Sequence, residues 1–485
     1  MALTHQWFIQ WTPSPHIFAD INSQYRNVNN WNSEHNGYVS VRGHRYTNNK
    51  MFCHKLQRIY FLHASRATGL TLWLAMLGVA RAQSVPADVD TPPFSTLYKW
   101  KYIDFEFPSP RHRRQAITVG KYVPANVLPL GIEIWDSRIW VTFPSWRKGV
   151  PATLATVSRE GGLASPALKP YPDWKFHRAF SDDNDCSILV SVFRVSADPC
   201  GRLWVLDSGQ IDSQDNPIQK CPPSIAVFDL KTDRIINRYV IPTEYVLQNS
   251  LFSNLIVDTR RKDCSDLHLY ISDTWRFGLI VFREYDATFW RFSHHLFYPD
   301  PLASNYSLHG VKFQWPDGIF GLSLTPINDY EDRTLYFHPL SSYREFGVST
   351  DVLRDFMRTN DSVSEFYLVG ESRGLNGQSS ASVIDRRGVM FFGLVSQDSI
   401  GCWDTRKPHS KKTIGVIARD TETLVYPNDI KVDQGDQQNV WVISNKLPLY
   451  QASRIDKNEY NYRILYADTS EAVKGLVCDP DISLL

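Results

Sequence analysis

The sequence predicts an all-β protein, a six-bladed β-propeller of four-stranded antiparallel blades around a central channel. One phrase occurs six times along the 485 residues: an alternating strand, a polar turn usually holding Asp, and a strand with an aliphatic–aromatic pair. Repeats of 50 to 66 residues predict blades, because a single small sheet cannot bury its own apolar faces. The aromatic residues that mark the six phrases are Trp140, Trp204, Tyr270, Tyr336, Phe391 and Trp441.

The six phrases supply the two inner strands, a and b, of each blade. They span 131–144, 194–209, 254–274, 321–340, 382–397 and 429–445. Two further strands, c and d, follow the second and third phrases within 224–242 and 278–294. A strand within 97–108 precedes the first phrase, and we expect it to complete the last blade and remove the free sheet edges. The alternative, two stacked β domains, is disfavoured by a sixfold repeat.

The N-terminal part has the pattern of a displaced secretory signal. Residues 69–79, GLTLWLAMLGV, are followed by Ala80-Arg81-Ala82, which is typical of a signal with an A-x-A cleavage site. The apolar run is too short to span a bilayer. A start at Met51 makes 51–82 the signal peptide, so we expect 1–50 to be a non-folding upstream extension, 83–95 a linker, 96–478 the propeller and 479–485 a tail. The alternative is a disordered extension on an intracellular protein.

Six cysteines follow the predicted signal, and an even set in an exported chain predicts disulfides. In the predicted blades Cys186 and Cys221 lie on one face, and Cys200 and Cys264 lie on the other, about 20 Å away. A Cys200–Cys221 bond is therefore excluded, whereas Cys186–Cys221 and Cys200–Cys264 stay open. The remaining two are Cys402 and Cys478. Sequons at Asn305 and Asn360 predict glycosylation in polar loops.

Charge and motifs exclude several functional classes. The chain has 52 Lys+Arg against 51 Asp+Glu and no long basic run, so we expect no nucleic-acid or membrane partner. Signatures of α/β-hydrolases, zinc proteases, P-loop NTPases and dinucleotide-binding folds are missing. We expect no cofactor and no metal.

Propeller geometry predicts where a ligand binds. Residues before strand a and after strand b share one face beside the channel, and polar groups gathered at a concave mouth form a common ligand site. Asn428 and Asn445 are the strongest candidates because they bracket one hairpin. The alternative is that such residues only cap strand ends. The other candidates are Asn254, Asp317, Gln378 and Asp429 before strand a, and Trp275, Gln397, Asp398 and Ser444 after strand b.

No catalytic residue is identified by a motif. His338 is the one histidine expected at the mouth, where it could serve as the base of a tautomerisation. The alternative is a polar strand end. Trp275 or Tyr426 could supply an aromatic wall for a ring or an ammonium group.

Several motifs resemble the insect yellow / major royal jelly protein family. They include VSVFRVSADPCGRLWVLDSG (190–209), CPPSIAVFDL (221–230), IGCWDT (400–405), YPNDIKVD (426–433) and VWVISNKL (440–447). The resemblance covers about 96–470. One departure is Pro144-Ser145-Trp146, where the family usually has Pro-Arg-Trp.

The resemblance implies a secreted, extracellular propeller that acts in the melanin and catecholamine pathway, as cuticle pigmentation proteins do. It implies a small aromatic amine or catechol derivative as the ligand at the channel mouth. Two alternatives stay open: a dopachrome isomerase-type enzyme, and an amine-scavenging salivary or nutritive royal-jelly-like protein. A homo-oligomer of the chain also stays open. A calcium-dependent hydrolase, as in other six-bladed propellers, is disfavoured by the resemblance.

Overall fold

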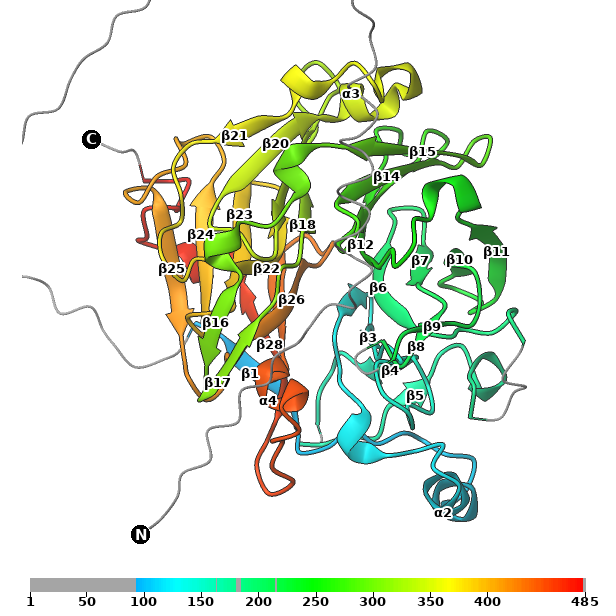
Figure 1. Cartoon of the computed structure of the whole chain (residues 1–485). Helices are drawn as coiled ribbons and strands as arrows, with labels where there is room; N and C mark the ends of the chain where they lie inside the picture. The colour runs from blue at the N-terminus through cyan, green and yellow to red at the C-terminus, as the bar shows by residue number, and fades with distance from the viewer. Residues whose placement is uncertain (1–92, 163, 180–184, 214–215, 483–485) are drawn as a thin grey trace, which may run out of the picture. The chain divides into compact units, whose positions relative to one another are not determined.

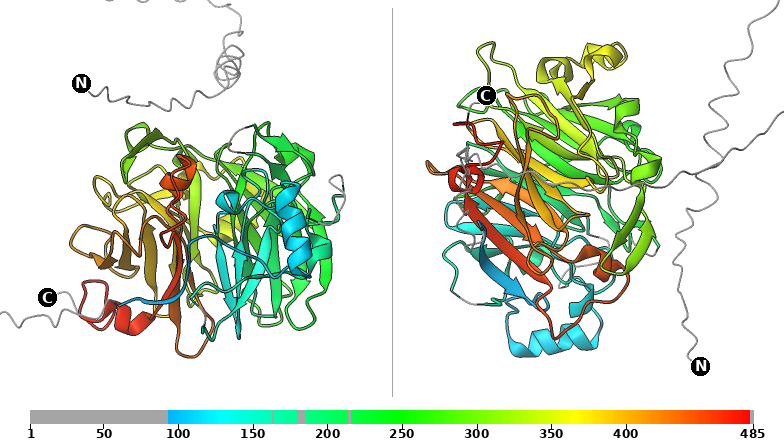
Figure 2. Two further views of the ribbon diagram at one scale, coloured as in Figure 1. Left: turned by 90° about the horizontal axis from the view of Figure 1, so that it is seen from below. Right: turned by 90° about the vertical axis from the view of Figure 1, so that its left-hand side faces the viewer.

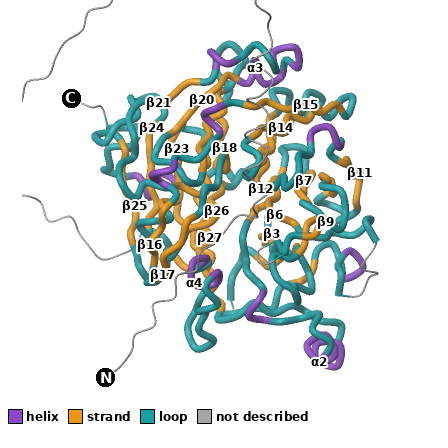
Figure 3. Tube along the Cα trace, in the orientation of Figure 1, coloured by secondary structure: helices purple, strands orange, loops and turns teal. Residues whose placement is uncertain are grey.

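The computed structural model describes residues 93–162, 164–179, 185–213 and 216–482. Over these ranges the chain forms six four-stranded antiparallel sheets arranged as the blades of a propeller, which confirms the predicted fold class. Inner strands lie around the centre of Figure 1 and outer strands at its periphery. Strands predominate, with a few short helices among the loops (Figure 3). The predicted extension and signal peptide lie outside the described residues.

The blades follow the chain in order, each from its inner to its outer strand. Blade 1 is β2 (Ile132–Trp135), β3 (Arg138–Thr142), β4 (Leu154–Ser158) and β5 (Lys169–Pro170). Blade 2 is β6 (Val192–Ala197), β7 (Arg202–Asp207), β10 (Ser224–Asp229) and β11 (Ile235–Val240). Blade 3 is β12 (Phe252–Asp258), β13 (His268–Asp273), β14 (Gly278–Arg283) and β15 (Thr288–Ser293). Blade 4 is β18 (Ile319–Leu324), β19 (Thr334–Pro339), β20 (Glu345–Ser349) and β21 (Tyr367–Val369).

Blade 5 is β22 (Ser379–Ile384), β23 (Val389–Leu394), β24 (Ser399–Asp404) and β25 (Ile414–Arg419). Blade 6 is β26 (Pro427–Val432), β27 (Asn439–Ser444), β28 (Tyr462–Asp468) and β1 (Ser95–Trp100). Two hairpins lie outside the blades: β8 (Gln210–Ile211) with β9 (Ile218–Gln219), and β16 (Asn305–Leu308) with β17 (Val311–Gln314). The α-helices within the described ranges are α2 (Pro110–Thr118), α3 (Thr350–Arg354), α4 (Leu447–Gln451) and α5 (Thr469–Val473).

The ring closes as the sequence predicted. Strand β1 pairs antiparallel with β28 and becomes the outer strand of the last blade, and the blue β1 lies beside the red β28 in Figure 2. Each inner strand contacts the next, in the order β2, β6, β12, β18, β22, β26 and back to β2. Closure pairs the first described strand with the last blade, so that blade is complete.

The repeated phrase has a physical cause in a buried hydrogen bond. In blade 2 the Trp204 indole Nε1 donates to Asp198 Oδ2 at 2.8 Å, and Asp198 Oδ1 also accepts the backbone N–H of Cys200 and Arg202. Blade 6 repeats this with Trp441 and Asp433 at 3.0 Å. The turn aspartate therefore both shapes the a–b turn and satisfies the polar atom of the buried ring that follows it.

Blade 1 provides a natural comparison, because the Nε1 of its marker residue Trp140 is buried without a hydrogen-bond partner among the described residues. Trp140 and Trp204 are both fully buried, and each lies under an arginine two residues earlier, Arg138 or Arg202. We expect Trp204→Phe to lower the free energy of unfolding by about 1–2 kcal/mol more than Trp140→Phe does. Urea melts of both variants measure this, and equal losses would contradict the role given to Asp198.

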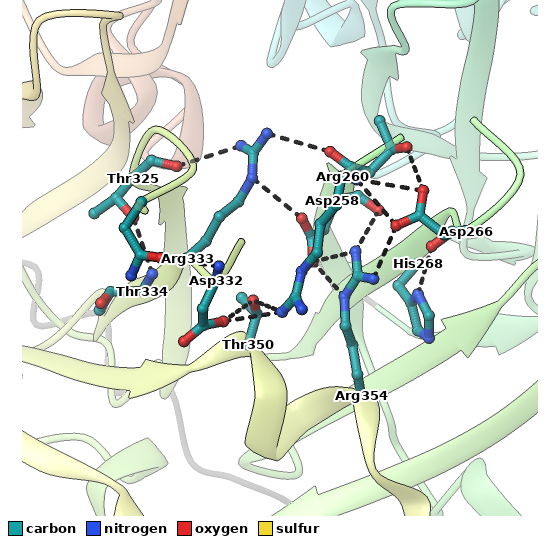
Figure 4. Close-up of polar contacts among 12 residues, drawn as sticks. Asp258, Arg260, Asp266, His268, Thr325, Asp332, Arg333, Thr334, Thr350 and Arg354 are labelled. Carbon is teal, nitrogen blue, oxygen red and sulfur yellow. Dashed lines mark hydrogen bonds and ion pairs between the residues drawn. The ribbon is translucent and has the colours of Figure 1, made fainter. Parts of the chain in front are cut away.

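Blades 3 and 4 are joined by a charge network on the face where the a–b turns lie. Figure 4 shows Arg354 of α3 reaching Asp258 and Asp266, and Arg333 also pairs with Asp258. Burial opposes ionisation of Asp266, but hydrogen bonds from Thr259, the Arg261 backbone and Arg354 lower the pKa of this carboxyl to about 2. The network therefore holds the two blades together through neutral and mildly acidic pH.

The cysteines pair as the blade assignment allows. Cys186 bonds Cys221 with Cα atoms 5.6 Å apart, Cys200 bonds Cys264 at 6.4 Å, and Cys402 bonds Cys478 at 5.9 Å. The excluded Cys200–Cys221 pair does not form. Three disulfides fit an oxidising compartment. No described helix is long and apolar enough to cross a membrane.

Both sequon asparagines, Asn305 and Asn360, are exposed. The loop predicted around Asn305 is wrong, since this residue begins β16. The alternating burial of this strand explains the difference, because Tyr306 and Leu308 are buried while Asn305 and Ser307 are exposed.

Candidate functional site

A pocket lies at the channel mouth, on the face where each strand a begins and each strand b ends. All six blades contribute to its wall. The wall is mainly aromatic and aliphatic, with four polar side chains other than the indoles and the phenol. The lining residues are Leu130, Trp146, Phe193, Ser213, Leu251, Trp275, Trp315, Asp317, Phe320, Leu340, Ser380, Tyr426, Asn428 and Leu447.

β-Bulges direct several of these side chains into the pocket. Five of the six inner strands shift their pairing register with the second strand of the blade directly after their first paired residue. They are β6, β12, β18, β22 and β26. A residue of the bulge lines the pocket in four of them: Phe193, Phe320, Ser380 and Asn428. A bulge inserts an extra residue and re-aims its side chain, and bulges are common beside active sites. The wall is thus built by backbone irregularities at equivalent positions of the blades.

Asp317 is the one acidic side chain among the described lining residues. It is 5% exposed, and its Oδ1 accepts a hydrogen bond from Trp275 Nε1 at 3.1 Å. Burial raises the pKa of the Asp317 carboxyl to about 7, although the indole N–H groups of Trp275 and Trp315 partly oppose the rise. A carboxyl with a pKa near neutrality exchanges protons readily at physiological pH, as a general acid or base must.

A buried arginine supports the pocket from the channel beneath it. Arg194 of β6 is fully buried, and its Nε lies 3.3 Å from Asp429 Oδ2 on β26. Its Nη2 donates to Asn428 Oδ1 at 2.8 Å and to the Asn428 carbonyl at 3.0 Å. Gly131 leaves room for this side chain, since a Cβ there would lie 2.9 Å from Arg194 Cδ. The contacts join blades 2 and 6 across the first inner strand.

Tyr426, which precedes β26, has φ of 53°. A non-glycine residue in the left-handed region is strained and persists only where the surrounding structure enforces it. Here the conformation places a buried ring on the pocket wall next to Asn428.

Of the predicted site residues, Trp275, Asp317 and Asn428 line the pocket, as does the expected aromatic wall residue Tyr426. The others lie outside the lining and are held by partners within the protein. Asn445 is fully buried, donates to the Pro129 carbonyl and accepts from the Leu447 N–H. Asp429 pairs with Arg194.

The remaining five candidates cap strand ends and bind loop groups, as the alternative in the sequence analysis proposed. Asn254 donates to the Phe320 carbonyl, Gln378 to that of Ala303, Gln397 to that of Asn376 and Ser444 to that of Thr423. Asp398 pairs with His309 of the β16–β17 turn at 2.9 Å. Strand-end polar side chains here satisfy neighbouring backbone and loop groups, and this use takes them away from the pocket.

The placement of His338 at the mouth is wrong. The ring is fully buried, with Nδ1 2.9 Å from Glu345 Oε2 and Nε2 3.2 Å from the Ser380 carbonyl. Glu345 also pairs with the buried Arg373 at 2.7 Å. His338 lies one residue before the end of β19, inside the blade, so its side chain packs against the neighbouring inner strand.

The β16–β17 hairpin lies over blades 5 and 6 (Figure 1). Its turn, His309-Gly310, has positive φ at both residues, as a tight hairpin turn requires. His309 reaches Asp398 after blade 5's second strand, and the Gly310 carbonyl accepts a hydrogen bond from Arg454 after blade 6's second strand. The pocket has a volume of about 30 Å³, which is enough for about two water molecules.

Sequence reasoning missed Arg194 and most of the hydrophobic wall: Trp146, Phe193, Trp315 and Phe320. Arg194 carried a signal, since it is a lone charge within the apolar strand Val192–Ala197. The bulged aromatics carried none that separates them from core residues.

The sequence is similar to those of known proteins. The family model described as major royal jelly protein matches residues 190–478, more than half of the chain. The chain belongs to the yellow / major royal jelly protein family. Within this family it is 43% identical over 394 residues to a dopaminechrome tautomerase of Drosophila melanogaster, a match that covers 80% of this chain and 85% of the relative.

Other members of the family are the yellow proteins. The chain is 40% identical over 386 residues to Protein yellow of Drosophila melanogaster, which covers 79% of this chain and 70% of the relative. Among solved structures, a luciferin-regenerating enzyme aligns with a TM-score of 0.41 and 13% identity, over 72% of this chain and 92% of that one. Where this family member departs from the usual Pro-Arg-Trp, Ser145 is buried and donates to the Val190 carbonyl, and Trp146 lines the pocket.

Proposed function

We propose that this protein is secreted and tautomerises an aminochrome, the cyclised ortho-quinone of a catecholamine, in the pocket at the channel mouth. The observation that carries the proposal is Asp317, a single buried carboxyl with a pKa near neutrality in an aromatic wall. The similarity of the chain to a dopaminechrome tautomerase and to yellow proteins supports a role in catecholamine-derived pigmentation. The displaced signal pattern and three disulfides support secretion.

The reaction is an isomerisation and needs no oxidant or reductant. Conversion of an aminochrome to the dihydroxyindole breaks one C–H bond at each of the two saturated ring carbons and forms one O–H bond at each quinone oxygen. Asp317 takes a proton from carbon as a carboxylate and returns it to oxygen as the acid, one proton at a time. The aromatic residues Trp275, Trp315 and Tyr426 provide the surfaces between which a flat bicyclic ring stacks.

The ligand must displace part of the wall to enter. Small-molecule sites usually enclose about 300 Å³ or more, whereas the volume of this pocket is about 30 Å³. The β16–β17 hairpin is the element whose movement would open it, since Trp315 directly follows β17 and two polar contacts hold its turn. Closure over the substrate would then exclude water from the reacting ring.

The charge of the lining predicts which aminochrome is preferred. Among the described lining residues there is no Lys, Arg or His, and the one carboxyl is that of Asp317. A carboxylated substrate would bring a second negative charge beside Asp317 without a cation facing it, which is costly in a desolvated site. We therefore expect dopaminechrome, which has no carboxylate, to be converted with a kcat/KM at least about tenfold above that of dopachrome.

Spectrophotometry of purified 83–485 with both aminochromes tests this, with heat-inactivated protein as the control for spontaneous conversion. Loss of the aminochrome's colour no faster than in the control would reject the enzyme. Calorimetric binding of dopamine in that case would favour the amine-binding alternative, for which the same aromatic wall and carboxylate are suited.

A further inference from the structure

The orientation of the Asn428 amide is fixed by its neighbour. A guanidinium has donors only, so the amide atom 2.8 Å from Arg194 Nη2 must be the acceptor Oδ1. Arg194 is itself fully buried and held by Asp429 through an ion pair, and Asp429 accepts the Ile132 and Ile430 N–H groups. The acceptor side of Asn428 is therefore taken by a group that cannot turn away.

The donor side of this amide is what remains for a ligand. Asn428 sits at the bulge of β26, where its side chain lines the pocket. Because Oδ1 faces Arg194, the Nδ2 amino group is the end available to the pocket. An amino group donates hydrogen bonds and repels an ammonium, so Asn428 suits an oxygen of the ligand and not the amine.

We propose that Asn428 Nδ2 donates to a carbonyl oxygen of the ligand and that Arg194 acts as the positioning residue that keeps the donor pointed inward. This assignment rests on the proposed function for its ligand class, an ortho-quinone. As a ring C–H proton passes to Asp317, the electron pair of that bond moves through the conjugated ring onto the carbonyl oxygen. The Asn428 donor binds this oxygen more strongly as its negative charge grows, until the proton from Asp317 completes the O–H bond.

Two substitutions at Asn428 test the donor without relying on turnover. Asn428→Asp keeps an acceptor for Arg194 but turns an oxygen toward the pocket, and Asn428→Leu removes the donor without adding charge. Isatin, a stable indole dione, probes carbonyl binding, and dopamine probes ammonium binding, both by calorimetry. Asn376→Asp, at an exposed loop residue, is the matched control.

The expected result is a loss of about tenfold or more in isatin affinity for both variants, with dopamine affinity raised only by Asn428→Asp. Isatin affinity within twofold of wild type in Asn428→Asp would overturn the assignment, as would a wild type that does not bind isatin. Asn428-dependent isatin binding in a protein that converts no aminochrome would leave the assignment standing and reject the enzyme. Aminochrome turnover that neither Asn428→Asp nor Asn428→Leu changes would reject the assignment of the donor and leave the enzyme standing.

The positioning role of Arg194 has its own readout. In Arg194→Met the amide is free to turn, so isatin affinity should fall while dopamine affinity rises. Arg194→Lys keeps a donor for Oδ1 and should restore the preference for isatin. Equal weakening of both probes in Arg194→Met, with no recovery in Arg194→Lys, would show that Arg194 only supports the fold.

Discussion

Asp317→Asn should lower kcat by about 100-fold to 10,000-fold, the usual contribution of a general acid or base. Asparagine has the same shape and can still accept the hydrogen bond from Trp275 Nε1, which lies 3.1 Å from Oδ1. It cannot take a proton from carbon at neutral pH. In the wild type, kcat/KM should rise with pH as the carboxyl of the free enzyme ionises, through a midpoint near its pKa of about 7.

The same substitution should stabilise the protein. The folded-state pKa of Asp317 lies above its ordinary value of 3.8, so the folded chain binds more protons than the unfolded chain between about pH 4 and pH 7. The free energy of unfolding therefore falls as pH rises through this window. Asn carries no charge and avoids this loss, so at pH 7 we expect a gain on the order of 3 kcal/mol.

Activity assays and urea melts across pH 4 to 8 measure both effects. Asp329→Asn, at an exposed loop residue, is the matched control and should change neither. A variant Asp317→Asn that keeps full turnover would remove Asp317 from the chemistry. A variant that loses both activity and stability would show that the carboxyl is needed for the fold.

Asp429→Ala should be among the most destabilising substitutions in the channel. It leaves Arg194 as a fully buried cation without its ion pair and takes away the acceptor of the Ile132 N–H at 2.9 Å. Breaking one side of a buried pair typically costs 3–5 kcal/mol, roughly, because the remaining charge stays in a poor solvent.

An exposed pair gives the comparison. Asp286 lies 2.7 Å from Arg283, and both side chains are more than a third exposed. Asp286→Ala should therefore cost no more than about 1 kcal/mol. The double variant Asp429→Ala/Arg194→Met should recover part of the loss, since it removes the unpaired charge. Equal melting temperatures of Asp429→Ala and wild type would contradict the account of the channel.

The fold could be predicted because its cause recurs in the chain. The turn aspartate and the buried ring of strand b, such as Asp198 with Trp204, are repeated often enough to count the blades and place the strands. Closure by β1 and the two open disulfide pairings followed from that placement. These features depend on period and chain direction, which a sequence carries explicitly.

The site could be predicted only to its face. Asn428 and Asp429 are neighbours in sequence, yet one lines the pocket and the other holds Arg194 beneath it. The difference is a β-bulge, a shift of one residue that reverses which side chain faces inward. Asn445 has the same residue type as Asn428, but both ends of its amide form hydrogen bonds with backbone groups. Residue type alone did not separate these cases.

A crystal structure of the protein with isatin bound tests the central claim most directly. The account predicts the ring in the pocket among Trp275, Trp315 and Tyr426, with a carbonyl oxygen within hydrogen-bond distance of Asn428 Nδ2 and the ring edge facing Asp317. Isatin bound elsewhere, for example in the groove lined by Lys99, Tyr460 and Arg463 on blade 6, with the mouth pocket unchanged, would contradict it.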